Sequence, residues 1–248
     1  MAEPVRPRAP LVPRHGVARV ISKLGLASRT AAAAWVRAGR VQVNGRAVRD
    51  PEFPVRQGVD RLTVDGEGAA AAARIVVMLN KPRGLVTTTR DEQGRATVYQ
   101  CLVGAGVPWL APIGRLDKAS EGLLLFTNDP VWAARLNAPG TGADKTNHVQ
   151  IDQLPSPQLL RQLADGVDID GARLRAKAAR SLRSGVRHAW LEIVLDEGRN
   201  RHIRRLLETC GVAVLRLVRV RIGNLALGEL PKGKWRPLNA REVAALCA

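Results

Sequence analysis

Residues 114–129 read Gly-Arg-Leu-Asp-Lys-Ala-Ser-Glu-Gly-Leu-Leu-Leu-Phe-Thr-Asn-Asp and join a polar loop to a run of large apolar side chains. The apolar run at 123–126 is typical of a buried strand, and the loop before it carries Arg115 and Asp117. Loops on a rigid scaffold commonly present reactive side chains, so Asp117 is a candidate catalytic carboxylate. An ordinary turn carboxylate is the alternative that these residues alone leave open.

The composition of the chain favours a polyanionic partner. Among 248 residues there are 39 lysines and arginines against 22 aspartates and glutamates, which gives a formal net charge of +17. Aromatic residues make up 3% of the chain, so we expect phosphate contacts rather than broad stacking platforms to supply affinity. We find no long apolar span and no basic amphipathic helix, so no membrane partner is expected. Three scattered cysteines without a C-x-x-C pair suit a reduced cytoplasmic compartment.

Residues 17–65 predict a small helical module followed by a hairpin. Ser28 is placed to cap a helix that stops at Gly39, and residues 40–48 alternate apolar and polar side chains around an Asn-Gly turn. A solvated basic face is the alternative to an RNA-binding surface here. The segments Lys23-Leu-Gly-Leu-Ala-Ser-Arg29 and Gly39-Arg-Val-Gln-Val-Asn-Gly45 resemble the S4 RNA-binding module. The resemblance implies RNA contacts from Lys23, Ser28, Arg29, Arg40 and Asn44.

The rest of the chain predicts a tail, a linker and a larger domain. Residues 1–16 are rich in proline and arginine, and we expect a flexible basic tail. Residues 66–74 are rich in glycine and alanine, as in an interdomain linker. Residues 75–248 alternate strand runs with a few helices, and the links are too short for regular crossovers. This pattern favours an α+β domain with a mixed, mainly antiparallel sheet.

A second group of chemically informative residues lies at 197–211. Its apolar residues mark one stripe of a helix, which leaves the arginines on the other side. Clustered arginines near a helix start bind phosphates well, although a solvated basic face is equally compatible with the pattern. In the strand expected at 214–222, Arg219 and Arg221 are predicted to point away from the packed face, towards phosphate. The candidate RNA contacts of the helix are Arg199, Arg201 and Arg205.

Four segments of the larger domain are similar to motifs of the ribosomal RNA pseudouridine synthases. They are Asn80-Lys-Pro-Arg-Gly84, Gly114-Arg-Leu-Asp117, residues 197–211 and residues 215–223. The resemblance implies that Asp117 is the catalytic residue, that Arg204 forms an ion pair with it and that Arg115 fills the place of a flipped nucleotide. It also implies RNA contacts from Lys81 and Arg83, although a structural turn at 80–84 is the alternative.

The implied reaction breaks the glycosidic bond of a uridine, turns the base and rejoins it to ribose through C5. A stacked target must first leave its stack. Asp117 either attacks ribose C1′ or removes a sugar proton, and the sequence does not choose between these routes. Either route needs one well-placed carboxylate, so we expect no cofactor and no metal. The expected partner is ribosomal RNA, and the expected oligomeric state is a monomer.

One departure from the family pattern concerns the uracil pocket, to which the resemblance also assigns Ile203. The usual Lys-x-Tyr motif appears as Lys145-Thr146-Asn147, so no aromatic ring is available to stack on the base. Losing such stacking costs about 1–3 kcal/mol. Three outcomes are open: His148 substitutes for the ring, activity is impaired, or the acid works in a poorer pocket. A non-catalytic RNA-binding or ribosome-assembly factor is therefore the alternative function.

Overall fold

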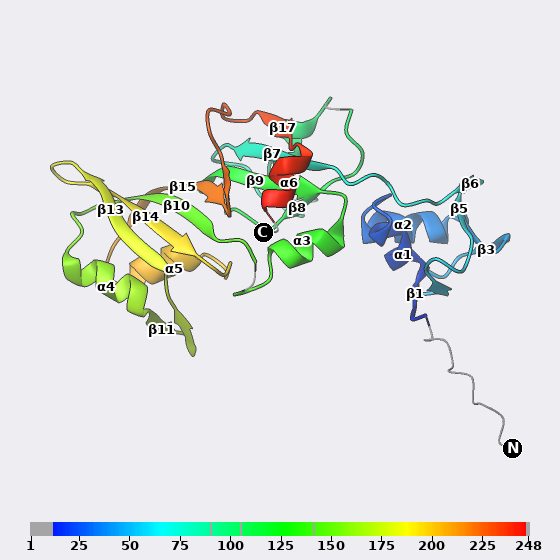
Figure 1. Ribbon diagram of the computed structural model, residues 1–248, viewed down its shortest axis with the longest axis horizontal. Helices are drawn as coiled ribbons and strands as arrows, with labels where there is room; N and C mark the ends of the chain where they lie inside the picture. Colours follow the sequence, from blue (N-terminus) through cyan, green and yellow to red (C-terminus); the bar gives the residue numbers. More distant parts are fainter. Residues whose placement is uncertain (1–11, 90, 105, 141, 247–248) are drawn as a thin grey trace, which may run out of the picture. The chain divides into compact units, whose positions relative to one another are not determined.

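The computed structural model describes residues 12–89, 91–104, 106–140 and 142–246, and these form two compact units that divide between Ala73 and Arg74 (Figure 1). Each unit has its own hydrophobic core.

The first unit contains two helices and two small sheets. Strands β1 and β4 pair with each other, and a four-stranded sheet has the order β3-β2-β5-β6. The elements, in chain order, are β1 (Arg14–Gly16), α1 (Val17–Lys23), α2 (Arg29–Arg37), β2 (Val41–Val43), β3 (Arg46–Val48), β4 (Pro54–Arg56), β5 (Leu62–Val64) and β6 (Glu67–Gly68). The predicted helix and hairpin are both present.

Local sequence signals explain the elements of this unit. The hydroxyl of Ser28 accepts a hydrogen bond from the backbone N–H of Ala31 (3.0 Å) and caps α2. Asn44 and Gly45 form the turn between β2 and β3 with φ of 51° and 82°, as an Asn-Gly hairpin requires. Apolar side chains of both helices and of the strands then form one core.

The structure differs from the expected tail and linker at their inner ends. Residues 14–16 of the expected 1–16 tail form β1, which pairs with β4, whereas residues 1–11 lie outside the described residues. Residues 67–68 of the expected 66–74 linker form β6, and the backbone N–H of Ala72 donates to the carbonyl of Leu24 (2.9 Å). Backbone pairing therefore attaches both segments to the first unit, although neither has the apolar residues that would indicate it.

The second unit is built on one sheet, in which nine strands of the described residues take part. The order is β13-β14-β10-β15-β9-β7-β17, with β16 on β15 and β8 on β9. The pairs are antiparallel except for β9 and β15, so the prediction of a mixed, mainly antiparallel α+β domain is confirmed. The elements are β7 (Val76–Lys81), η1 (Val98–Leu102), β8 (Ala111–Ile113), β9 (Glu121–Thr127), α3 (Pro130–Leu136), β10 (Lys145–Ile151), α4 (Pro157–Asp165), β11 (Val167–Ile169), β12 (Ala172–Leu174), β13 (Ala178–Ser184), β14 (Ala189–Leu195), α5 (His202–Thr209), β15 (Val214–Ile222), β16 (Leu225–Ala226), β17 (Trp235–Pro237) and α6 (Ala240–Ala245).

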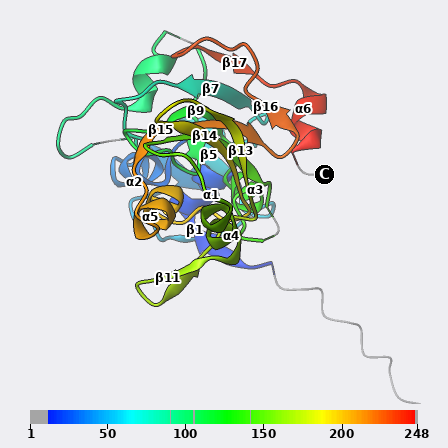
Figure 2. The ribbon, with the colours of Figure 1, turned by 90° about the vertical axis from the view of Figure 1, so that its left-hand side faces the viewer.

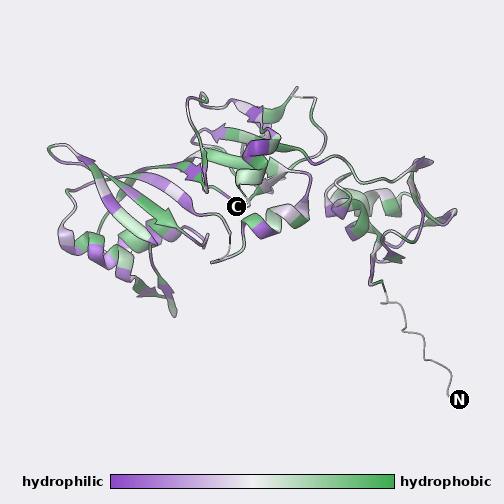
Figure 3. Ribbon diagram, viewed as in Figure 1, coloured by the Kyte–Doolittle hydropathy of each residue, from purple (hydrophilic) through white to green (hydrophobic). Residues whose placement is uncertain are grey.

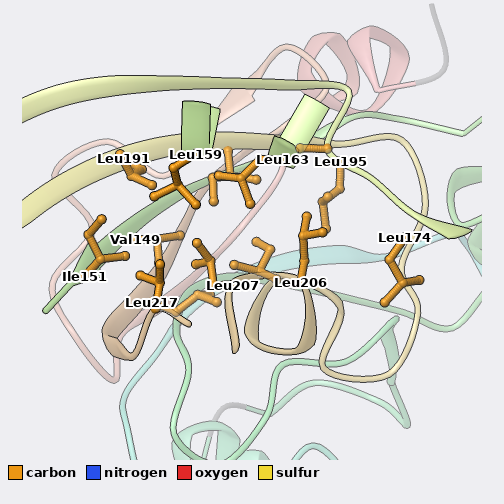
Figure 4. Packing of buried hydrophobic residues seen from close by; sticks show 14 of the residues in the cluster. Val149, Ile151, Leu159, Leu163, Leu174, Leu191, Leu195, Leu206, Leu207 and Leu217 are labelled. Atoms are coloured by element: carbon orange, nitrogen blue, oxygen red, sulfur yellow. The ribbon is translucent and has the colours of Figure 1, made fainter. Parts of the chain in front are cut away.

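Helices α4 and α5 cover one face of the sheet half formed by β13, β14, β10 and β15 (Figures 1 and 2). Figure 4 shows leucines of these helices packed against apolar residues of β10, β14 and β15. The other half of the sheet is buried on both faces. Leu123 and Leu125 of β9 pack in one core, whereas Leu124 and Phe126 pack in another, which explains the unbroken apolar run of this strand (Figure 3).

The position of β9 beside β15 depends on Gly122. It lies opposite Arg219 in the parallel pair and has φ of +100°. A Cβ atom at this position would lie 2.3 Å from the carbonyl oxygen of Arg219. Only glycine permits this close approach, which fixes the loop before β9 at the centre of the sheet.

Candidate active site

A cavity of about 570 Å³ opens beside the 114–120 loop. The loop contributes Arg115 and Asp117, and the start of α5 contributes Ile203 and Arg204. Asn147 lines the cavity from β10. The structure thus brings the expected catalytic residues and two of the three expected uracil-pocket residues to one place. Other expected residues at the cavity wall are Arg199, Arg201 and Arg219.

Lys81 fixes the backbone of the Asp117 loop. Its side chain is fully buried, and Nζ donates hydrogen bonds to the carbonyl oxygens of Pro82 (3.1 Å), Asp117 (3.1 Å) and Ser120 (2.8 Å). Burial lowers the pKa of Lys81 to about 8, against the opposing negative charges of Asp117 and Glu121. The expectation that Lys81 contacts RNA is therefore wrong, because its ammonium group is used inside the protein.

Further hydrogen bonds attach the same loop to residues 84–87. The hydroxyl of Thr87 donates to the carbonyl of Leu116 (2.7 Å) and accepts from the backbone N–H of Leu116 (3.3 Å). The N–H of Gly84 donates to the carbonyl of Lys118 (2.7 Å). Asp117 thus projects from a backbone that is bonded on both sides, as a catalytic carboxylate requires.

Arg204 reaches the Asp117 loop from α5. Nη2 donates to the carbonyl of Ala119 (3.4 Å), and Nη1 donates to the carbonyl of Val214 (3.3 Å). Burial and the positive charge of Arg201 lower the pKa of Arg204, whereas the charge of Asp117 opposes this shift. Within the described residues no ion pair joins Arg204 to Asp117, so the expected direct pair is absent: the guanidinium bonds the loop backbone instead.

Arg219 is buried in the cavity wall and is not an exposed phosphate contact as expected. Its Nε donates to the carbonyl of Leu123 (2.7 Å), and burial lowers its pKa to about 10. Arg219 lies on the same face of β15 as the buried Leu217, and a register shift follows it: Thr146 lies opposite Arg221 and Asn147 lies opposite Arg219, so Val220 is an extra residue on β15. The two arginines therefore differ, and Arg221 is exposed.

His148 does not take the place of the missing aromatic ring. It alternates with Asn147 along β10 and points to the other face of the sheet, where Nε2 lies 3.4 Å from Oε2 of Glu192. Glu192 also accepts a hydrogen bond from Arg180 (2.7 Å). Of the expected uracil-pocket residues, His148 is thus the one that lies outside the cavity.

Several of the remaining expected RNA contacts are exposed, and some of these also have partners within the protein. In the second unit Arg83, Arg199 and Arg201 are exposed; Arg199 also pairs with Glu197, and the partly buried Arg205 pairs with Asp170. In the first unit Arg29 is exposed and Lys23 is partly exposed; Arg40 pairs with Asp65, Ser28 caps α2 and Asn44 accepts from the N–H of Arg61. The residues with partners therefore stabilise the fold as well as contributing positive charge or polar groups to the surface.

Three residues of the site carry no role in the sequence interpretation. They are Thr87, Lys145 and Glu121. Glu121 is buried and pairs with Arg216 and Lys232, and these hydrogen bonds outweigh burial, so the pKa of Glu121 is lowered. A charged residue at the start of an apolar strand is the signal that indicates such a buried pair. Lys145 could be found as the first residue of the altered motif, whereas Thr87 gives no sequence signal.

No cluster of His, Cys, Asp or Glu suited to a metal ion occurs among the described residues. In the same part of the chain, no helix has the length and apolar character needed to cross a membrane.

Comparisons with known proteins agree on one family. The family model described as RNA pseudouridylate synthase matches residues 75–209, and an S4 domain model matches residues 17–60. Ribosomal large subunit pseudouridine synthase B of Bacillus subtilis is 34% identical over 93% of this chain and 94% of its own length. The Pseudomonas aeruginosa protein of the same name is 35% identical over 97% of this chain, which spans 64% of that relative.

A solved structure gives the same result. The chain titled "Crystal structure of pseudouridylate synthase" matches with a TM-score of 0.65 and 28% identity, and the match covers 94% of this chain and 99% of that one. An RNA pseudouridine synthase of Aquifex aeolicus is 34% identical over 92% of both chains. The expected family is confirmed: this chain belongs to the RNA pseudouridylate synthases and carries an S4 domain in its first unit.

Proposed function

We propose that this protein converts a uridine of ribosomal RNA to pseudouridine, with Asp117 as the catalytic carboxylate. The observation that supports it most is the fixed position of Asp117 at the cavity. Lys81 donates a hydrogen bond to the carbonyl of Asp117, Thr87 donates one to the carbonyl of Leu116, and Asp117 lines the cavity. The names of the B. subtilis and P. aeruginosa relatives specify the large ribosomal subunit, which makes its RNA the first substrate to test.

The reaction needs the target nucleoside in the cavity beside Asp117. The N1–C1′ bond breaks, the uracil turns, and C5 bonds to C1′; C5 then loses a proton and N1 gains one. Asp117 contacts the ribose either as the nucleophile at C1′ or as the base for a sugar proton. Arg115 is exposed on the same loop, and we assign it the place that the flipped nucleotide leaves in the RNA. One carboxylate is sufficient for both routes, so neither a metal nor a cofactor is needed.

The positive charge around the cavity provides the attraction for RNA. Arg201 and Arg83 are exposed near Arg204, where both lower its pKa, so all three act on the same region of space. Phosphate contacts from such residues give affinity that falls steeply with salt. We propose that the exposed Arg29 of the S4 unit contributes to the same RNA interaction and that the protein acts as a cytoplasmic monomer.

A second candidate function is RNA binding without catalysis. The observation that favours it is Asn147, which is 3% exposed and provides no ring for stacking on uracil. A ribosome-assembly factor could keep the cavity and the basic surface after losing activity. Both candidates predict RNA binding, so only a chemical assay separates them.

The deciding experiment incubates the protein with unmodified transcripts of large- and small-subunit ribosomal RNA and maps pseudouridine by carbodiimide-blocked primer extension. We expect one or a few modified uridines with the wild type and none with Asp117→Ala. Product from Asp117→Ala would overturn the assignment of the acid. A blank map for the wild type, with product restored by Asn147→Tyr, would establish the binding-only function.

A further inference from the structure

One wall of the Asp117 cavity carries polar side chains with atoms that have no hydrogen-bond partner among the described residues. This polar wall consists of Lys145 and Asn147 on β10 and Arg219 on β15. Their side chains are 8%, 3% and 7% exposed, respectively. Buried polar groups normally have hydrogen-bond partners, so three such residues at a cavity indicate that a ligand supplies them.

The amide of Asn147 has a defined orientation. Its Nδ2 donates to the carbonyl oxygens of Lys145 (3.0 Å) and Ile193 (3.4 Å), and Ile193 lies opposite it on β14. The amide nitrogen is thereby used by the sheet. Among the described residues Oδ1 has no donor, so Asn147 offers an acceptor.

Donors lie near this acceptor along β10 and across on β15. Lys145 lies two residues before Asn147, and therefore on the same face of β10, and its Nζ is buried without a partner among the described residues. Arg219 lies directly opposite Asn147 on β15, and its Nη2 is likewise buried and unpartnered there. The polar wall thus presents a donor, an acceptor and a donor.

We propose that the polar wall recognises the edge of the target uracil that carries O2, N3–H and O4. This inference rests on the proposed function and deepens it. Lys145 and Arg219 donate to the two carbonyl oxygens, and Oδ1 of Asn147 accepts from N3–H. Cytosine has an acceptor at N3 and a donor at C4, so it leaves two of the three groups mispaired.

The symmetry of uracil makes this edge suited to an isomerisation. Turning the detached base about its N3–C6 axis exchanges N1 with C5 and O2 with O4. The edge therefore shows an acceptor, a donor and an acceptor both before and after the turn. The polar wall can bind substrate and product orientations alike, and hydrogen bonds replace the stacking that Asn147 cannot provide.

Two buried cations alone would also suit a phosphate group, but the acceptor between them argues for the base. A phosphate oxygen beside Oδ1 of Asn147 would bring two acceptors together without a proton. Uracil places N3–H at that position instead. The test below therefore includes inorganic phosphate as a competitor.

The probes are uridine 5′-monophosphate, its N3-methyl derivative, pseudouridine 5′-monophosphate and cytidine 5′-monophosphate, and binding is measured by ligand-observed NMR and calorimetry. With the wild type we expect uridine and pseudouridine monophosphates to bind within about threefold of each other. N3-methylation should weaken binding by about 10-fold, the value of one buried hydrogen bond. Asn147→Leu should bind uridine monophosphate about 10-fold more weakly and should show no further loss on methylation.

The controls separate the polar wall from general damage. Thr146 lies next to Asn147 on β10 and points to the opposite face of the strand. The variant Thr146→Ala should therefore keep the methylation penalty of the wild type. Asn147→Ala replaces Asn147→Leu if melting curves show that the leucine variant does not fold. Methylated and unmethylated probes that bind within twofold, an equal methylation penalty in the Asn147 variant, or full displacement by inorganic phosphate at equal concentration would each overturn the proposal.

The outcomes for the two proposals are distinguishable. If pseudouridine forms on ribosomal RNA but methylation of the probe costs less than twofold, the function stands and the polar-wall inference fails. If no ribosomal RNA is modified while the probes show the expected preferences, the proposed function fails and the polar wall remains a uracil site.

Discussion

Replacing Lys81 with methionine should lower the stability of the fold and remove the hydrogen bonds that hold the Asp117 loop in place. Methionine keeps most of the buried volume but removes the ammonium group from three carbonyl oxygens at 2.8–3.1 Å. Each buried carbonyl left without a hydrogen bond costs about 1–3 kcal/mol. Methionine also avoids the free-energy cost of burying a charge, and this gain offsets part of the loss. We expect a net loss of about 2–4 kcal/mol in the free energy of unfolding, measured in urea.

The same change should affect catalysis more than RNA binding. The carbonyl of Asp117 is one of the three acceptors, and a displacement of about 1 Å in a catalytic group commonly costs about 100-fold in rate. Single-turnover pseudouridine formation should therefore fall by about that factor, while filter-binding affinity for RNA stays within twofold. The matched control is Lys118→Met, an exposed lysine of the same loop. Wild-type stability and rate in the Lys81 variant would refute the positioning role.

The lowered pKa of Lys81 also predicts how the free energy of unfolding changes with pH. Burial lowers its pKa from 10.5 to about 8 in the folded protein. Between about pH 8 and 10 the unfolded chain binds more protons than the folded chain, so this residue makes stability rise with pH. The unfolding free energy of the wild type minus that of Lys81→Met should increase over this range. Parallel curves would show that the ammonium group is not desolvated.

Three further changes test the loop, the strand pair and the RNA surface. Gly122→Ala should cost more than about 3 kcal/mol in urea unfolding, because its Cβ would lie 2.3 Å from the Arg219 carbonyl; a normal transition would contradict that close approach. Thr87→Val, which is isosteric, should lower kcat about 10-fold with KM little changed, because both hydrogen bonds to Leu116 are lost, and an unchanged kcat would exclude this role. Arg83→Gln should reduce the slope of log affinity for ribosomal RNA against log salt by about 1, and an unchanged slope would place Arg83 outside the phosphate contacts.

Local signals predicted the elements that depend on neighbouring residues. Ser28 accepts a hydrogen bond from the first turn of a helix, as its position indicated, and Asp129 and Ser156 do the same at α3 and α4. The unbroken apolar run of β9 indicated a buried strand, and the sheet provides one core on each of its faces. These features follow from propensity and periodicity, which act within about ten residues along the chain.

The sequence predicted which residue types form the candidate site but only some of the contacts between them. Asp117, Arg115 and Arg204 line one cavity, although they come from segments almost 90 residues apart. No pattern along the chain shows that Lys81 donates to the backbone of a loop 36 residues later. From the sequence, a lysine close to a proline and a glycine is expected at the surface. Lys81 is buried because β7, which ends with it, pairs with β9.

Arg219 shows why register decides function in this sheet. Regular alternation puts Arg219 and Arg221 on one face, and both then appear as phosphate contacts. Arg219 keeps the regular alternation from the buried Leu217, and one extra residue, Val220, then breaks it opposite Thr146 and Asn147, so Arg221 is exposed while Arg219 faces the cavity. The buried guanidinium of Arg219 comes from the residue that lies across from Asn147. If the polar wall binds uracil, regular alternation from Leu217 is what aims Arg219 at the base, and the extra residue Val220 is what keeps Arg221 out of the cavity.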